Sequence, residues 1–170
     1  TAATSQPHVA AAGNVTTNCR PHERDALLAF KQGMTNDTSN LLYYWLPGQD
    51  CCRWAGITCS SKTGNVVKLY LGASMYIDGA LVGQISPSLL SLEYLEYLDL
   101  SRNFLEGPNS SVPEFLGSMR NLRHLDLSFI PFSGRVPPLF GNLTKLEYLD
   151  QSNTSFFGTV PPMLGNLSNL

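Results

Sequence analysis

Four cysteines are the residues of this chain best suited to covalent or metal chemistry. Cys51, Cys52 and Cys59 lie close together, and Cys19 lies well before them. Four cysteines allow three disulfide pairings. Because adjacent cysteines rarely pair, we expect Cys19–Cys51 and Cys52–Cys59, which would stabilise the fold by roughly 3–4 and 2–3 kcal/mol. A zinc site is the competing interpretation. The spacing provides no second pair of closely spaced ligands, so we expect no bound metal.

Groups suited to catalysis are few. His124 and Asp126 fall on the same face of a predicted strand, but no GxSxG, HExxH or glycine-rich phosphate loop accompanies them. We therefore expect neither an enzyme nor a cofactor. The net charge of -2 gives no reason to expect a nucleic acid or an anionic membrane as a partner. No apolar run reaches the roughly 18 residues of a membrane span.

Asparagine side chains provide a further chemistry, because Asn-x-Ser/Thr sequons accept N-linked glycans on the secretory route. Six sequons together with the cysteines favour an extracellular protein. The alternative is that Asn is simply common at a repeated position, where Asn142 and Asn166 fall. The sequon asparagines are Asn14, Asn36, Asn109, Asn142, Asn153 and Asn166.

The chain that carries these residues is repetitive. The segment from Leu122 reads LRHLDLSFIPFSGRVPPLFGNLTK, and the segment from Leu146 reads LEYLDQSNTSFFGTVPPMLGNLSN. A period of about 20–29 residues with an LxxLxL core indicates a leucine-rich-repeat solenoid. The positions that recur are Leu122, Leu125, Phe132, Gly134, Val136, Pro137, Gly141, Asn142 and Leu143, as Leu146, Leu149, Phe156, Gly158, Val160, Pro161, Gly165, Asn166 and Leu167.

Three segments follow from this pattern. Residues 66–170 hold about four repeats, the last cut short. Residues 19–65 begin with a helix pattern that places Leu27 and Phe30 on one face and ends near Gly33, and they finish in a hairpin that leads into the first parallel strand. We interpret residues 19–65 as an N-terminal cap that covers the first coil. Residues 1–18 are too poor in large apolar side chains to fold, and we expect a flexible tail.

Several motifs resemble the plant extracellular leucine-rich-repeat family: ERDALLAFKQGM, LLYYW, DCCRWAGITC, TGNVVKLYL and LDLSRNFLEG. The resemblance covers about residues 19–170, and it points in particular to receptor-like proteins that confer resistance to fungal pathogens or perceive fungal xylanase. It implies an α/β solenoid, a right-handed superhelix with a concave parallel β-sheet and a disulfide-bonded cap. It also implies an extracellular binding role. Polygalacturonase inhibitors, which are secreted and soluble, share the cap and the repeat.

Alternating side chains along the predicted strands would form outward-facing columns on the sheet. We interpret Tyr97, Arg102, His124, Phe129 and Tyr148 as candidate ligand-binding residues, since aromatic and Arg side chains dominate binding hot spots. The alternative is a solvated face that carries repeat consensus. That alternative is favoured for the Asp and Ser columns. The columns are Lys68, Tyr97, His124 and Tyr148; Tyr70, Asp99, Asp126 and Asp150; Gly72, Ser101, Ser128 and Ser152; and Ala73, Arg102, Phe129 and Asn153.

The chain departs from the family pattern in two ways. The Asn that closes LxLxxN in the family bonds backbone groups between coils. It is present at Asn103, but Ser74, Ile130 and Thr154 stand at the equivalent positions. Gln151 replaces an inward leucine, and an unpaired buried amide would cost about 1–3 kcal/mol.

These observations favour non-catalytic recognition of an extracellular protein, peptide or glycan, in defence or development signalling. The protein would lie in the apoplast or on the outer face of the plasma membrane, and a co-receptor kinase would contact further C-terminal repeats. One alternative is a secreted inhibitor of a pathogen cell-wall hydrolase. The other is a truncated decoy with no ligand of its own.

Overall fold

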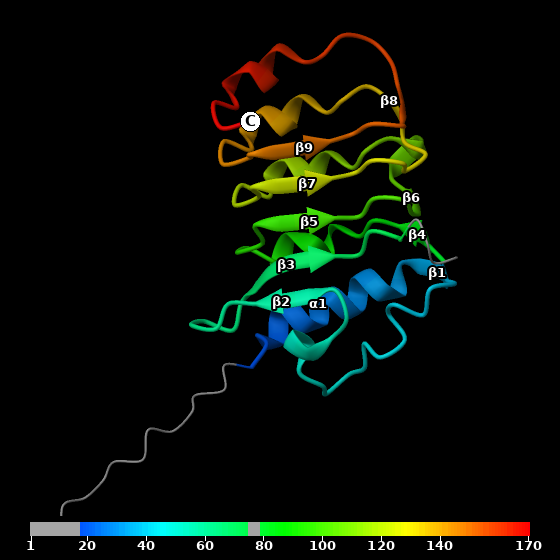
Figure 1. Ribbon diagram of the computed structural model, residues 1–170, viewed down its shortest axis with the longest axis vertical. Coiled ribbons are helices and arrows are strands. Elements are labelled where there is room, and N and C mark those ends of the chain that lie inside the picture. Colours follow the sequence, from blue (N-terminus) through cyan, green and yellow to red (C-terminus); the bar gives the residue numbers. More distant parts are fainter. Residues whose placement is uncertain (1–17, 75–78) are drawn as a thin grey trace, which may run out of the picture.

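The computed structural model describes residues 18–74 and 79–170. Apart from Asn18, the expected N-terminal tail lies outside the described residues, as does the sequon residue Asn14. Figure 1 shows the described chain as a stack of coils, with helix α1 (Pro21–Gln32) beside one end and the red segment that closes the sequence at the other.

A five-stranded sheet joins the coils in the order β2-β3-β5-β7-β9 (Figure 1). Strands β3, β5, β7 and β9 pair in parallel, whereas β2 pairs antiparallel with β3 and forms the predicted hairpin. The sheet is therefore mixed. The right-handed winding of the coils and the concavity of the sheet stay predictions. The strand bounds are β2 (Ile57–Cys59), β3 (Val66–Tyr70), β5 (Tyr97–Asp99), β7 (His124–Asp126) and β9 (Tyr148–Asp150).

A short 3-10 helix precedes each of the strands β5, β7 and β9. Proline fits the start of such a helix because its φ is already suitable and it lacks an N–H that would go unpaired. The helices η4, η5 and η6 pack on one another in succession. The 3-10 helices are η1 (Cys51–Arg53), η2 (Pro87–Ser91), η3 (Pro108–Ser110), η4 (Glu114–Ser118), η5 (Pro138–Asn142) and η6 (Pro162–Asn166).

The core is a ladder of leucines between the sheet and the 3-10 helices. Leu69, Leu98 and Leu125 are directly paired across β3, β5 and β7, and all three are fully buried. Leu100 and Leu127, two residues further along, are fully buried as well. Burial of a leucine side chain contributes about 1.5–3 kcal/mol, so this repeated stacking is the main source of stability in the coils.

A second sheet, which the sequence analysis did not predict, has the order β1-β4-β6. Strand β1 (Met34–Asp37) belongs to the cap and pairs antiparallel with β4 (Leu81–Gln84). Strand β4 in turn pairs in parallel with β6 (Phe104–Glu106). The pair β8 (Ser133–Gly134) and β10 (Ser155–Phe156) is also parallel. The second sheet connects the cap to the first two coils on a side that the leucine pattern does not mark.

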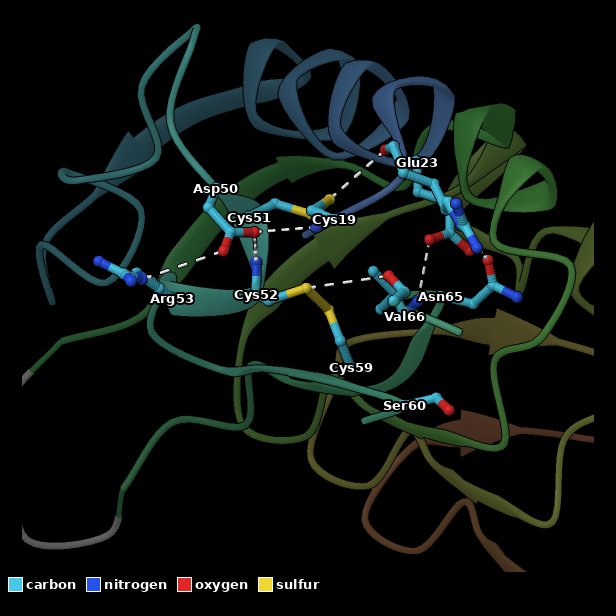
Figure 2. Close-up of a disulfide and its surroundings, with 12 residues drawn as sticks. Cys19, Glu23, Asp50, Cys51, Cys52, Arg53, Cys59, Ser60, Asn65 and Val66 are labelled. Carbon is cyan, nitrogen blue, oxygen red and sulfur yellow. Dashed lines mark hydrogen bonds and ion pairs between the residues drawn. A yellow bond between two sulfur atoms is a disulfide. The ribbon is translucent and has the colours of Figure 1, made fainter. Parts of the chain in front are cut away.

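Both expected disulfides hold the cap. Cys19 is bonded to Cys51 and Cys52 to Cys59, with Cα–Cα distances of 5.4 and 5.5 Å. These sulfurs are thus not available as thiolate ligands for zinc. The Asp50 carboxylate lies between the two bridges, where its Oδ1 accepts the backbone N–H of Cys19 at 2.9 Å and of Cys52 at 3.1 Å (Figure 2).

Two tryptophans fill the centre of the cap. The rings of Trp45 and Trp54 stack with their centroids 5.2 Å apart, and both are buried. Trp45 Nε1 donates to the carbonyl oxygen of Ala55 at 3.2 Å. The predicted helix ends as expected, with Gly33 at its C-cap, and it contacts the first coil through Ser88 Oγ, which donates to the carbonyl oxygen of Ala26 at 2.9 Å.

Glu23 ties α1 to the first strand of the repeats. Its side chain is fully buried, and Oε2 accepts the backbone N–H of Val66 at 2.9 Å (Figure 2). Its other oxygen, Oε1, is buried without a hydrogen-bond partner among the described protein groups. Burial raises the pKa of this carboxyl, although the Val66 N–H and the charges of His22 and Arg20 act in the opposite direction.

Asn103 bonds backbone groups of two coils, as the resemblance implies. Its Oδ1 accepts the N–H of Leu81 at 2.8 Å, and its Nδ2 donates to the carbonyl oxygens of Leu71 at 2.8 Å and Leu100 at 2.9 Å. The side chain is 1 % exposed, so these bonds satisfy groups that water cannot reach.

The departures from the repeat have different consequences. Ile130 stands at the position equivalent to Asn103 in the next coil. It is fully buried, so apolar packing takes the place of hydrogen bonds at that position. Thr154 bonds only within its own coil, where its Oγ1 donates to the carbonyl oxygen of Gln151 at 2.8 Å. The Nε2 of Gln151 is buried without a partner among the described residues. An unpaired amide of this kind weakens the coil by about 1–3 kcal/mol.

Glycines in the 3-10 helices allow neighbouring coils to approach closely. A methyl group on Gly141 would lie 2.6 Å from the Cβ and the carbonyl oxygen of Met163, and one on Gly117 would lie 2.6 Å from the Cβ of Leu139. The space beside Gly165 is open, with no atom within 4 Å. These glycines recur because the backbone of the next coil occupies the position of a side chain.

Acidification should stabilise this protein through Glu23. A carboxyl whose pKa is raised in the folded state contributes stability that is complete below its unfolded pKa and is lost as the pH rises through the folded pKa. Urea unfolding monitored by circular dichroism between pH 4 and pH 7 should therefore show that the unmodified protein gains stability towards acid relative to Glu23→Gln. Parallel pH profiles of the two proteins would contradict this role of Glu23.

Replacement of Gly141 by Ala should destabilise the stack by about 1–3 kcal/mol, because the added methyl group meets backbone of the next coil. Gly165→Ala is the matched control and should be neutral or slightly stabilising, since Ala also restricts the unfolded chain. Urea unfolding of both variants checks the difference. Equal urea midpoints for the two variants would show that the contact between Gly141 and the next coil is not tight enough to affect stability.

Candidate functional site

Four side chains on the main sheet form one continuous stack, here called the aromatic ladder: Lys68, Tyr97, His124 and Tyr148. The register pairs Lys68 with Tyr97, Tyr97 with His124, and His124 with Tyr148. Lys68 Nζ lies 4.0 Å from the centroid of the Tyr97 ring. The ring centroids of Tyr97 and His124 are 3.9 Å apart, and those of His124 and Tyr148 are 4.2 Å apart.

The rings of the ladder are nearly parallel, with interplanar angles of 8° and 2°. Each face of the His124 ring is therefore covered by a tyrosine, and the Tyr97 ring lies between His124 and the Lys68 ammonium. A molecule that lands on this surface meets ring edges and hydroxyl groups. Aromatic pairs of this kind contribute about 0.5–1.5 kcal/mol beyond area burial, so the ladder is also a clamp between coils.

Burial favours the neutral form of the His124 imidazole in the aromatic ladder. It lowers the pKa of the His124 imidazole, and the Lys68 ammonium lowers it further, while the Asp99 and Asp126 carboxylates raise it. Burial, followed by the charge of Asp99, raises the pKa of the Tyr97 phenol. His124 Nε2 is buried and makes no hydrogen bond to the described residues. Near neutral pH the ladder thus presents a neutral imidazole between two phenols.

The Asp column has a structural task. Asp99 Oδ1 accepts the backbone N–H of Ser101 at 2.9 Å, and Asp126 and Asp150 bond the serines two residues after them at 2.9 and 2.8 Å. The Ser152 N–H also holds the pKa of Asp150 below its ordinary value. These contacts account for the repeated Asp-x-Ser pattern without a ligand, although Asp99, Ser101 and Ser128 are buried rather than solvated.

Arg102 and Phe129 form a second contact on the same face. The Arg102 guanidinium carbon lies 3.9 Å from the centroid of the Phe129 ring. Arg102, Phe129 and Asn153 occupy equivalent positions where each strand ends, and all three have positive φ values, of 60°, 56° and 55°. This backbone suits Asn but is an outlier for a bulky Phe. Strain of this kind at an exposed ring points towards a functional role.

The structure thus brings together the five candidate ligand-binding residues in two adjacent groups on one face. Lys68 also belongs to the aromatic ladder, although it was not among the candidate ligand-binding residues. Its place in the same predicted column as Tyr97 could have identified it. Of the sequons, Asn153 lies on this face at the end of β9, and Asn36, Asn109, Asn142 and Asn166 are likewise exposed. The ring stacking itself depends on side-chain conformations that no sequence pattern encodes.

A cavity of about 770 Å³ lies elsewhere, beside Cys19, and is lined by Arg20, Arg24 and Lys62. Its cations would suit an anion, but Arg20 Nε donates to Asn65 at 3.3 Å and Arg24 Nε lies 3.5 Å from the Asp25 carboxylate. We place the candidate site on the sheet face, because the strand register brings the candidate side chains together there and their rings stack.

The imidazole of His124 should titrate below the range of a free histidine. Its carbon-bound protons can be followed by NMR as the pH is varied, and Lys68→Met should move the midpoint upward, because a neighbouring cation has been removed. Arg123→Met is the control, since Arg123 engages Glu96 and Glu147 instead. A midpoint at the free-histidine value, or one that Lys68→Met leaves unchanged, would contradict the electrostatics described above.

Comparison with known proteins identifies the cap and the repeats. The family model described as "Leucine rich repeat N-terminal domain" matches residues 20–60, and the model "Leucine Rich Repeat" matches residues 94–119 and 121–143. The chain is 45 % identical over 126 residues to the tomato (Solanum lycopersicum) receptor-like protein EIX2, covering 71 % of this chain and 12 % of that protein. The match thus spans about an eighth of its relative's length.

Solved structures show the same fold. A plant ice-binding protein superposes with a TM-score of 0.76 at 32 % identity, over 90 % of this chain and 47 % of that one. The Arabidopsis thaliana receptor kinase HAESA, solved with the peptide hormone IDA and the co-receptor SERK1, gives a TM-score of 0.62 at 27 % identity, over 88 % of this chain and 28 % of that one. The cap, the repeats and these likenesses agree, and the chain belongs to the plant extracellular leucine-rich-repeat family, with receptor-like proteins among its relatives.

Proposed function

We propose that this chain is the N-terminal part of the extracellular, non-catalytic recognition module of a receptor-like protein. It binds a protein, peptide or glycan in defence or development signalling, and it does so through the sheet face that carries the aromatic ladder. The observation that carries this proposal is the continuous stack of Lys68, Tyr97, His124 and Tyr148 on one exposed face.

The chemistry of the face supports recognition by hydrogen bonds and apolar contact together. Tyr148 is 43 % exposed and Phe129 is 41 % exposed, so both can lose water-accessible surface on binding. Lys68 and Arg102 lie at the edges of the two groups, where each cation already rests on an aromatic ring. Rings held in place by stacking lose little freedom on binding, which favours affinity.

Size indicates that the face acts as part of a longer surface. Five strands of three to five residues, about 4.8 Å apart and about 3.3 Å long per residue, give roughly 250–300 Å² of sheet face, whereas a standard interface needs about 800 Å² from each partner. The relatives are far longer than this chain. We infer that further repeats of a right-handed superhelix extend a concave face, and that a co-receptor kinase contacts repeats outside this segment.

The relatives support an extracellular location. The receptor kinase HAESA was crystallised with a peptide hormone and a co-receptor, and the fold of the present chain matches part of it. Both disulfides suit an oxidising compartment. Within residues 18–74 and 79–170, no helix is long and apolar enough to cross a membrane.

A binding screen tests the proposal. The chain, secreted from plant cells, would be probed with a purified fungal xylanase, a random peptide library and a glycan array. We expect a ligand whose affinity falls at least tenfold, about 1.4 kcal/mol, in a Tyr97→Ala, His124→Ala double variant. The control is Glu114→Ala, Ser118→Ala, which changes two exposed residues of η4.

Two results would overturn the proposal. Failure of every probe to bind would favour a decoy with no ligand of its own, and equal losses in the two double variants would remove the aromatic ladder from the site. Inhibition of a fungal polygalacturonase by the chain would instead support the alternative of a secreted inhibitor.

A further inference from the structure

A preformed cleft in the cap lies directly beside a glycosylation sequon. Its volume is about 440 Å³, and the residues that line it include Lys31, Asn36, Asp37, Asn40 and Tyr43. That volume is within the range of about 300–1,000 Å³ found for clefts that hold small molecules. None of the residues that line the cleft belongs to the sheet face, so the cleft would hold a different molecule from the proposed ligand of that face.

Hydrogen bonds fix the wall of the cleft. The Asp37 carboxylate accepts the backbone N–H groups of Leu41 at 3.1 Å and Leu42 at 2.8 Å. From the other side, Lys31 Nζ donates to the carbonyl oxygen of Trp45 at 2.9 Å. The loop between β1 and η1 is thereby attached to both β1 and α1. A cleft held in this way needs no rearrangement to receive an occupant.

The same loop exposes aromatic surface that the protein leaves uncovered. Tyr43 is 64 % exposed and Tyr44 is 70 % exposed, and their rings meet edge to face with centroids 4.9 Å apart. Only Tyr43 of the two lines the cleft. The outer side of a terminal cap is expected to be polar, so an exposed ring there calls for a polar covering group.

The sequon places a sugar at this point. Asn36, Asp37 and Thr38 form an Asn-x-Thr sequon, and Asn36 is exposed. Asn36 lies on β1, the edge strand of the β1-β4-β6 sheet, and it lines the cleft itself. Asn36 and Tyr43 line the same cleft, so a glycan attached to Asn36 Nδ2 would begin at the cleft that the Tyr43 ring also borders.

We propose that an N-linked glycan on Asn36 lies in this cleft and packs its first N-acetylglucosamine residues on Tyr43. The donor is a lipid-linked oligosaccharide diphosphate of the secretory pathway. Nδ2 of Asn36 forms a bond to C1 of the first sugar, the bond between C1 and the diphosphate oxygen breaks, and Nδ2 loses one proton as the lipid diphosphate leaves.

The docked glycan does two things for the cap. The C–H face of the sugar covers the Tyr43 ring, while its hydroxyl and amide groups face Asn40, Asp37 and solvent. It also shields the free edge of β1, where exposed backbone groups would otherwise pair with another chain. The glycan is thus a structural part of the cap, independent of any ligand on the sheet face.

The experiment uses the full chain secreted from plant cells, with glycopeptides analysed by mass spectrometry. We expect Asn36 to be occupied and Asn36→Gln to lower the thermal midpoint by about 2–4 °C. Tyr43→Ala should lower it similarly in the glycosylated protein and have no further effect in the Asn36→Gln background. Tyr44→Ala is the matched control, and its effect should be the same in both backgrounds.

A second measurement separates docking from mere attachment. Enzymatic release of the Asn36 glycan should be at least tenfold slower from the native protein than from the denatured one. The glycan of Asn142, on the exposed end of η5, provides the internal comparison. An unoccupied Asn36, equal native release rates at Asn36 and Asn142, additive effects of the Tyr43 and Asn36 changes, or a dimer that buries Tyr43 would each overturn the proposal.

Discussion

Each coil of this protein can bury its leucines only when the neighbouring coil stacks on it in register. Leu98 and Leu125 are paired directly and are both fully buried, and a shift by one residue would turn the buried set towards solvent. The first coil has no preceding coil, so β2 pairs with its strand and Glu23 binds the N–H of Val66. The disulfides secure the segment that supplies this substitute neighbour.

The candidate site is a second product of the same register. Residues that alternate with the buried leucines align on the outer face at the spacing of the strands, about 4.8 Å. Tyr97, His124 and Tyr148 come from three different coils, yet their rings are in contact. A ligand on this face would therefore contact rings from several coils at once. A substitution of one ring would also disturb the rings that stack on either side of it.

The coils, the cap helix and the disulfides could be predicted from the sequence, whereas the second sheet and the stacking of the rings could not. Repetition indicated the coils and the columns, and the spacing of the cysteines indicated both disulfides. Met34–Asp37 carries no alternating pattern, so nothing marked β1 or its sheet. That pairing depends on Gly83, where a side chain would meet the carbonyl oxygen of Gly33 at 2.4 Å. The stacked rings and the positive φ of Phe129 arise from three-dimensional contacts between coils, which sequence spacing does not encode.

The glycines in the 3-10 helices also govern the shape of any longer protein built from these coils. On the sheet side, hydrogen bonds set the distance between coils, whereas at Gly117 and Gly141 that distance is limited by direct contact with Leu139 and Met163. The ratio of the two distances determines how sharply a stack of coils bends. A larger residue at such a position would push neighbouring coils apart on one side only, so a single substitution there can change the curvature of the stack.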